Sequence, residues 1–134
     1  MRVLKTETLA LRDQNEIVLA RQAARRWAAE LGLSLVDQTK IVTATSELAR
    51  NAVEYGGGGT MTLELLETET RRGLRIIFED HGPGIADVSL ALSDGYTTGN
   101  GMGLGLGGSR RLVNEFDIQS RVGEGTRISI VRWK

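Results

Sequence analysis

Cysteine is absent from this chain of 134 residues, which also has a single proline and a single histidine. Without cysteine there is no disulfide, no thiolate zinc site and no cysteine nucleophile. With only one histidine, His81, a metal site built from several histidines is excluded as well. The lack of cysteine fits the cytoplasm, which we expect as the location of the protein.

An excess of charge of either sign is absent too. Lysine and arginine number 17, as do aspartate and glutamate, so the formal net charge at pH 7 is zero. Nucleic acids and acidic membranes attract basic proteins, so neither is expected as a partner. No stretch approaches the roughly 18 apolar residues of a transmembrane helix. The first residues are charged where a signal peptide would be apolar. We expect one globular domain, residues 1–134.

Glycine is abundant, with 17 residues against a usual share of about 7% of a chain. The glycines gather at 56–59, 82–84, 99–108 and 123–125. Glycine is used where the backbone takes a positive φ or approaches another group closely. This clustering indicates loops with a function.

Two helices are predicted in the first half of the chain. Asp13 opens the first and Gly32 ends it, while Ser34 opens the second, which stops near Tyr55. Apolar residues recur at helical spacing in both. These residues are Ile17, Ala20, Ala24, Trp27, Ala28 and Leu31 in the first helix, and Ile41, Ala44, Thr45, Leu48 and Ala52 in the second.

Alternating residues predict five strands, with a third helix late in the chain. The strands are 3–11, 60–67, 74–79, 117–122 and 126–133, the helix is 104–116, and a long loop runs from 81 to 100. Helices and strand pairs mix without strict βαβ alternation. The predicted fold class is therefore an α/β (α+β) two-layer sandwich, with a mixed, mainly antiparallel sheet and helices on one face.

Glu47 and Asn51 stand four residues apart in the second predicted helix, so both lie on one face of it. That face flanks the apolar stripe around Leu48, at the rim where a pocket between helix and sheet would open. The alternative interpretation is a pair of ordinary polar residues on a helix flank.

Asp80 ends a predicted strand and precedes the tight turn of residues 81–84. A carboxylate at the mouth of a sheet can accept a hydrogen bond from an amino group, such as that of adenine. The alternative is an aspartate that only caps the turn.

A glycine run, GMGLGLG at 101–107, precedes the third predicted helix. Its glycines permit close backbone approach, and free N–H groups at a helix start favour phosphate. The run is no Walker A loop, since no GK[ST] follows, and it lacks the strand that precedes a dinucleotide fingerprint. A merely flexible loop remains the alternative.

The segments ELARN (47–51), DHGPG (80–84), GMGLGLG (101–107) and GEGT (123–126) occur in an order that resembles the N, G1, G2 and G3 boxes of the GHKL ATPases and kinases. Within that group, the short length and the run DQTKIVTATSELARN (37–51) are similar to the RsbT-type serine/threonine switch kinases. These are relatives of the anti-sigma-factor kinases of bacterial stress regulation. The resemblance extends over nearly the whole chain.

The resemblance implies the Bergerat ATP-binding fold with ATP and Mg²⁺ as cofactors. Glu47 would be the general base for the substrate hydroxyl, Asn51 would hold Mg²⁺, and Asp80 would accept from the adenine amino group. The remaining nucleotide-binding residues would be Gly82, Gly84, Gly101, Gly103, Leu104, Gly105, Leu106, Gly107 and Thr126.

Residues 87–100 would form a lid over ATP, with Gly95 and Gly99 as hinges. No lysine lies beside the glycine run, where the nearest basic residues are Arg110 and Arg111. One of these arginines could approach the γ-phosphate, although solvated surface positions suit them better.

The resemblance further implies a protein serine/threonine kinase that phosphorylates a STAS-domain antagonist. After phosphorylation it would switch to another partner, such as a phosphatase or a stressosome scaffold. The kinase would be a monomer or a homodimer. The alternative function is an anti-sigma factor whose ATP site is a conformational device. A histidine kinase catalytic domain would need an attached helix pair with a phosphoacceptor histidine, and an Hsp90- or MutL-like ATPase would need further domains.

Overall fold

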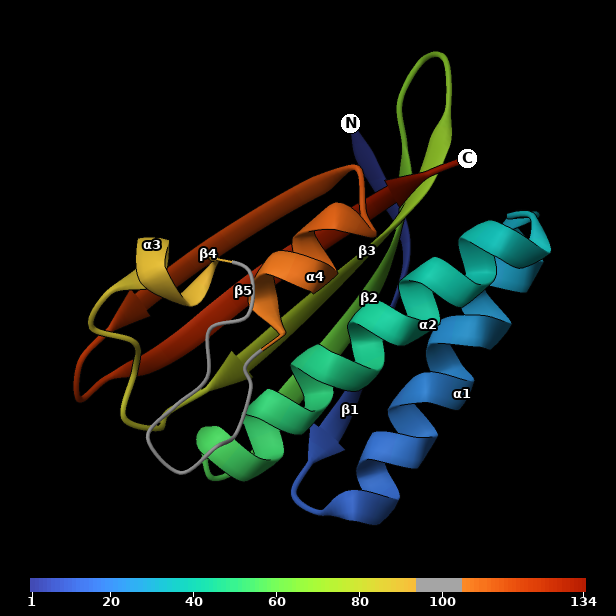
Figure 1. The fold of residues 1–134 in the computed structure, drawn as a ribbon. Coiled ribbons are helices and arrows are strands. Elements are labelled where there is room, and N and C mark those ends of the chain that lie inside the picture. Colours follow the sequence, from blue (N-terminus) through green and yellow to red (C-terminus); the bar gives the residue numbers. More distant parts are fainter. Residues whose placement is uncertain (94–104) are drawn as a thin grey trace.

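The computed structural model describes residues 1–93 and 105–134 and consists of a sheet with helices against one face (Figure 1). The elements in chain order are β1 (Arg2–Leu11), α1 (Gln14–Leu31), α2 (Leu35–Arg50), the π-helical turn η1 (Asn51–Tyr55), β2 (Gly59–Glu67), β3 (Arg72–Asp80), α3 (Val88–Ala91), α4 (Leu106–Arg111), β4 (Glu115–Arg121) and β5 (Gly125–Trp133).

The ends of the two long helices confirm the predicted capping residues. The Asp13 carboxylate accepts from the Glu16 N–H at 3.0 Å, and the Ser34 hydroxyl accepts from the Asp37 N–H at 3.1 Å. Each contact satisfies a backbone donor that has no partner within the helix. Gly32 ends α1 with a φ of 91°, a conformation that favours glycine.

The sheet has the order β1-β2-β3-β5-β4, and each neighbouring pair is antiparallel. The predicted two-layer sandwich with a mainly antiparallel sheet is confirmed. Among the strands that the structure describes there is no parallel pair, so the sheet is antiparallel and not mixed. The central strands β3 and β5 lie side by side because the β4–β5 hairpin pairs through β5. The end of β3 therefore lies beside the start of β5, where Asp80 is opposite Thr126.

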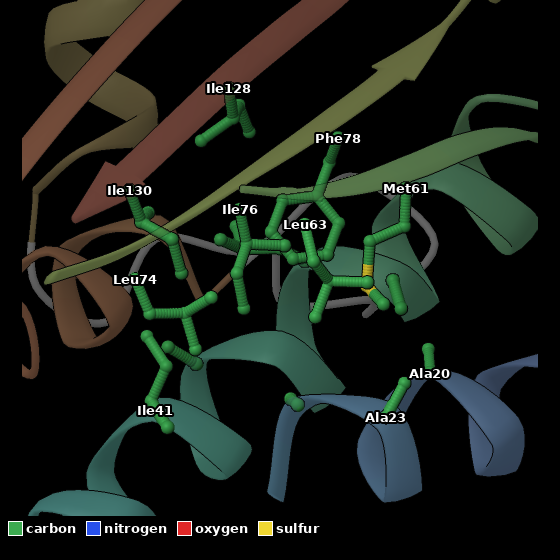
Figure 2. Packing of buried hydrophobic residues seen from close by; sticks show 14 of the residues in the cluster. Ala20, Ala23, Ile41, Met61, Leu63, Leu74, Ile76, Phe78, Ile128 and Ile130 are labelled. Carbon is green, nitrogen blue, oxygen red and sulfur yellow. The ribbon is translucent and has the colours of Figure 1, made fainter. Parts of the chain in front are cut away.

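The core lies between the sheet and the long helices. Strand residues of alternate positions point toward α1 and α2, as Figure 2 shows for Leu63, Ile76 and Ile130. On the helices, small alanines such as Ala20 and Ala44 are fully buried, so the two layers approach closely. Both apolar stripes predicted for the helices are buried as expected.

The prediction of a helix over 104–116 is wrong in its second half. Helix α4 ends at Arg111, and Phe116 belongs to β4, where it pairs with Ile130. The apolar spacing up to Phe116 suits a helix face and a strand equally well. Pairing with β5 decides between them, and it begins where the Asn114 N–H donates to the Val131 carbonyl at 2.9 Å.

The loop predicted over 81–100 is also interrupted by structure. Asp87 accepts from the Leu90 N–H at 3.0 Å and caps the short helix α3. Gly95 and Gly99, the predicted hinges, lie outside the described residues. Among the helices that the structure describes, none is long and apolar enough to cross a bilayer.

Truncating Leu63 tests the packing of this core. Leu63 is fully buried, whereas Leu35 at the start of α2 is 75% exposed. Leu63→Ala is expected to lower the free energy of unfolding by about 2–5 kcal/mol, because it removes buried apolar atoms and leaves a cavity. The same change at Leu35 is expected to lower it by less than about 0.5 kcal/mol. Urea unfolding measures both, and equal losses would contradict the assigned core.

Candidate active site

Glu47 lies on the solvent-facing side of α2. Its neighbour Leu48 is 1% exposed and anchors the helix to the core, so Glu47 itself is turned to the rim, as predicted. Its Oε1 accepts from Nη1 of Arg50 at 2.9 Å. Arg50 was not predicted to belong to the site. Residues three apart on a helix are neighbours, so the spacing of Glu47 and Arg50 could have indicated this contact.

The structure brings Glu47 against the end of the glycine run. A Cβ added at Gly105 would lie 2.6 Å from Oε2 of Glu47, and Gly105 has a φ of 64°. Both features require glycine, since a side chain would clash and the left-handed conformation is costly for other residues. Leu106 and Gly107 follow as buried residues of α4. Gly101, Gly103 and Leu104 lie outside the described residues.

Asn51 follows Glu47 by one turn, at the point where α2 passes into η1. The carbonyl of Asn51 accepts from the Gly56 N–H at 2.8 Å, which closes a wider turn than that of an α-helix. Such π-turns are frequent at functional sites. The turn carries Tyr55 to the G1 segment, where its hydroxyl donates to the Gly84 carbonyl at 3.0 Å.

Asp80 ends β3 and is half-buried. Its Oδ1 accepts from the Gly82 N–H at 3.0 Å, and the Thr126 N–H also donates to it. Burial raises the pKa of the carboxyl above its ordinary value of 3.8, although both hydrogen bonds act in the opposite direction. The carboxylate is therefore partly shielded from water at the mouth of the sheet.

Glycine backbone surrounds Asp80. A Cβ at Gly56 would lie 2.4 Å from Cγ of Asp80, and one at Gly82 would lie 2.6 Å from Cα of Gly56. From the other side, a Cβ at Gly125 would lie 2.1 Å from the Asp80 carbonyl oxygen. Gly56 belongs to the glycine cluster at 56–59 that was predicted to form a functional loop, but its contact with Asp80 was not predicted.

Thr126 lies opposite Ser120 in the β4–β5 hairpin. Their hydroxyl oxygens are 2.7 Å apart, and the Ser120 hydroxyl also accepts from the Ile85 N–H at 2.8 Å. This chain of hydrogen bonds attaches the G1 segment to the hairpin. Ser120 was not predicted, because its place beside Thr126 follows from the strand register.

Two hollows accompany these groups. Asp80, Thr126 and Val88 line one of about 620 Å³, at the ends of the central strands. Glu47, Gly105 and their neighbours line another of about 460 Å³, between α2 and α4. Both lie in the size range of small-molecule sites. The described residues contain no cluster of three or more acidic, histidine or cysteine side chains for a metal ion.

Of the other residues considered from sequence, Arg110, Arg111 and His81 are exposed. Arg111 lines the hollow beside Glu47. Of the lid predicted over 87–100, only the part up to Ser93 is described.

Replacing Asp80 by Asn tests the buried carboxylate. Burial raises the pKa of the Asp80 carboxyl, so above that pKa the ionised carboxylate lowers the stability of the folded state. This destabilisation disappears as the pH falls below the raised pKa. Asp80→Asn is therefore expected to melt at a higher temperature than the wild type at pH 7, with the difference shrinking toward pH ~4. Thermal unfolding followed by circular dichroism between pH 4 and 8 measures this. A lower melting temperature of the variant at pH 7 would contradict it.

Two solved structures share the fold. The RsbU and RsbW domains of Rv1364c from Mycobacterium tuberculosis superpose with a TM-score of 0.67 at 24% identity, over 97% of this chain and 33% of that chain. The catalytic domain of the histidine kinase ThkA superposes with a TM-score of 0.55 at 17% identity, over 96% of this chain and 95% of that chain.

The sequence itself has curated relatives. It is 48% identical over 118 residues to the serine/threonine-protein kinase RsbT of Bacillus subtilis, covering 88% of this chain and 89% of that protein. It is 29% identical over 128 residues to an anti-sigma F factor of Anoxybacillus flavithermus, covering 90% of this chain and 85% of that protein. Residues 36–134 match the family described as "Histidine kinase-, DNA gyrase B-, and HSP90-like ATPase". The resemblance drawn from the motifs is thus confirmed, and the chain belongs to the family of histidine kinase-, DNA gyrase B- and HSP90-like ATPases.

Proposed function

We propose that this protein is a serine/threonine kinase that transfers the γ-phosphoryl group of ATP to a hydroxyl of a STAS-domain antagonist, within a bacterial partner-switching pathway. The observation that carries the proposal is the carboxylate of Glu47 against Gly105, beside an open hollow. It is supported by the 48% identity to RsbT, whose name states a serine/threonine-protein kinase.

The residues around Asp80 suit an adenine base. A carboxylate offers about four lone-pair sites, so Asp80 can accept from the adenine amino group while it keeps its bonds to backbone N–H groups. Gly82 and Gly84 would shape the adenine pocket through the close backbone packing that they allow, and Thr126 would contact the base directly or through water. The hollow at the ends of the central strands is large enough for a purine.

The glycine run would hold the phosphates through its backbone N–H groups. We assign this role to Gly101, Gly103, Gly105 and Gly107, with Leu104 and Leu106 between them. Asn51 would hold Mg²⁺, an ion that binds few protein ligands together with phosphate oxygens and water. When bound, Mg²⁺ would neutralise charge on the phosphates. This ligand set fits a chain in which no acidic metal cluster is found among the described residues.

Glu47 would act on the acceptor. As the hydroxyl oxygen of the Ser or Thr forms its bond to the γ-phosphorus, the bond from that phosphorus to the oxygen of the leaving ADP breaks. The hydroxyl proton passes to the Glu47 carboxylate, and ADP and the phosphorylated protein leave. Arg50 keeps one oxygen of Glu47 in place through its bond of 2.9 Å. Positioning and charge neutralisation are the main needs of phosphoryl transfer.

The resemblance suggests how phosphorylation would be used. It would weaken the complex with the antagonist and release the kinase, in the cytoplasm, to a second regulator such as a phosphatase, with a stressosome scaffold as a further partner. The kinase would be a monomer or a homodimer.

A second function, an anti-sigma factor, is favoured by the anti-sigma F factor relatives at 26–30% identity. In that case the protein would bind a sigma factor, and ATP would set the conformation of the binding surface. A pull-down with purified sigma factors tests this second function, because an anti-sigma factor has to form a complex with a sigma factor.

Glu47→Gln tests the proposed base. The amide cannot accept the hydroxyl proton, so transfer from [γ-³²P]ATP to a purified STAS-domain antagonist protein is expected to slow by about 100-fold or more. Binding of a non-hydrolysable ATP analogue should change little. Glu54→Gln is the matched control, since Glu54 is exposed and bonded to Gln14 of α1. Wild-type protein that transfers no phosphate, or a Glu47→Gln variant as fast as the wild type, would refute the proposal.

Asp80→Asn separates binding from chemistry in the same assay. Its amide offers a donor where the adenine amino group needs an acceptor, so affinity for the ATP analogue is expected to fall by at least about tenfold. Isothermal titration calorimetry measures this loss. Unchanged affinity would remove Asp80 from the adenine site.

A further inference from the structure

The hollow beside Glu47 is a groove between α2 and α4, here called the α2–α4 groove. Its walls are Thr43 and Glu47 on α2 and, on the α4 side, Gly105, Gly108, Ser109 and Leu112. The two helices lie next to each other in Figure 1. We propose that this groove docks the acceptor segment of the protein substrate, a stretch of extended chain with acidic side chains next to the reacting Ser or Thr. The proposal rests on the kinase function proposed above.

The position of Glu47 is the first argument. A general base acts only within hydrogen-bond reach of the hydroxyl that it deprotonates, so the acceptor has to pass beside this carboxylate. The groove begins at Glu47 and extends along α2 to Thr43, one turn earlier on the same face. A substrate segment that lies in the groove brings its hydroxyl next to the Glu47 carboxylate.

The second argument is the shape of the α4 wall. Gly105 and Gly108 have no side chains, and Leu112 adds an apolar surface, so a peptide backbone can come close to α4. A Cβ at Gly108 would meet no atom of the described residues within 4 Å, which makes this position an open part of the groove.

The third argument is an unsatisfied hydroxyl. Ser109 is 1% exposed, and its Oγ has no hydrogen-bond partner in the described structure. Buried polar groups without a partner are rare because they lose their bonds to water and gain none. A backbone N–H or C=O of a docked segment would supply the missing partner.

Charge determines the chemistry of the segment. Lys40 lies one turn before Thr43 on the same face of α2, and within residues 1–93 and 105–134 it has no ion pair. The charged residues that line the groove are Glu47 and Arg111, and Arg50 balances the charge of Glu47 through their ion pair at 2.9 Å. Lys40 therefore adds a positive charge at the end of the groove, which favours an acidic partner and disfavours a basic one.

Filling the groove is the direct test. Gly108→Phe adds a ring at a position where a Cβ meets no atom of the described residues within 4 Å, and helix α4 gains by losing a glycine. The probe is the same purified STAS-domain antagonist protein as in the Glu47→Gln assay. The kcat/KM for its phosphorylation is expected to fall by about tenfold or more, while affinity for the non-hydrolysable ATP analogue and the melting temperature stay unchanged. Gln22→Phe, on the exposed face of α1, is the matched control.

Two further variants test the chemistry of the groove and do not depend on the folding of Gly108→Phe. Lys40→Glu should raise KM for the STAS protein several-fold with kcat little changed, and Arg25→Glu, an equal change of charge on exposed α1, should not. Ser109→Ala should raise KM as well, while the melting temperature stays the same or rises, since an unpartnered buried hydroxyl is removed.

The outcomes separate the two proposals. Wild-type protein that phosphorylates no STAS protein overturns the kinase function and this inference with it. If the wild type is active and the Gly108→Phe and Lys40→Glu variants are equally active, the groove inference is overturned and the kinase function stands. A Gly108→Phe variant that loses affinity for the ATP analogue also overturns it, because the groove would then belong to the nucleotide site.

Discussion

The packing of Gly56 against Asp80 is the constraint on which the site depends. Gly56 ends the turn η1, and a side chain there would overlap the Asp80 carboxyl. Because Glu47 and Asn51 precede this turn on the same helical segment, the contact sets how near they come to the end of β3. A larger residue at position 56 would move the helix end away from the sheet. The distance of Glu47 and Asn51 from Asp80 thus depends on the missing side chain at Gly56.

Helix α2 serves the core and the site with different faces. Its buried face includes small residues such as Ala44, which lets it lie close to the sheet. Its other face carries Glu47, with Arg50 bonded to one carboxylate oxygen and Gly105 against the other. One carboxylate oxygen of Glu47 is thus hydrogen-bonded to Arg50 and the other faces Gly105, where the absence of a side chain leaves room for it.

Family membership alone does not decide what the site does, since histidine kinases, gyrases and chaperones share it. Two local features support the narrower function proposed above. One is the carboxylate of Glu47, the proposed base, and the other is the open groove that leads to it along α2 and α4. A protein that only bound nucleotide would need neither. Together they favour an enzyme whose second substrate is the surface of another protein.

The sequence by itself determined the two long helices with their caps, the two-layer fold and the order of the motifs that carry Glu47, Asn51 and Asp80. These features depend on local periodicity and on residues close together in the chain, so they can be predicted without neighbours. The tertiary structure decided the features that depend on pairing between segments far apart in the chain. It placed Phe116 in a strand because β5 offered hydrogen bonds, brought Ser120 beside Thr126, and put Gly56 against Asp80. Such contacts join segments far apart in sequence, and no local pattern encodes which of them meet.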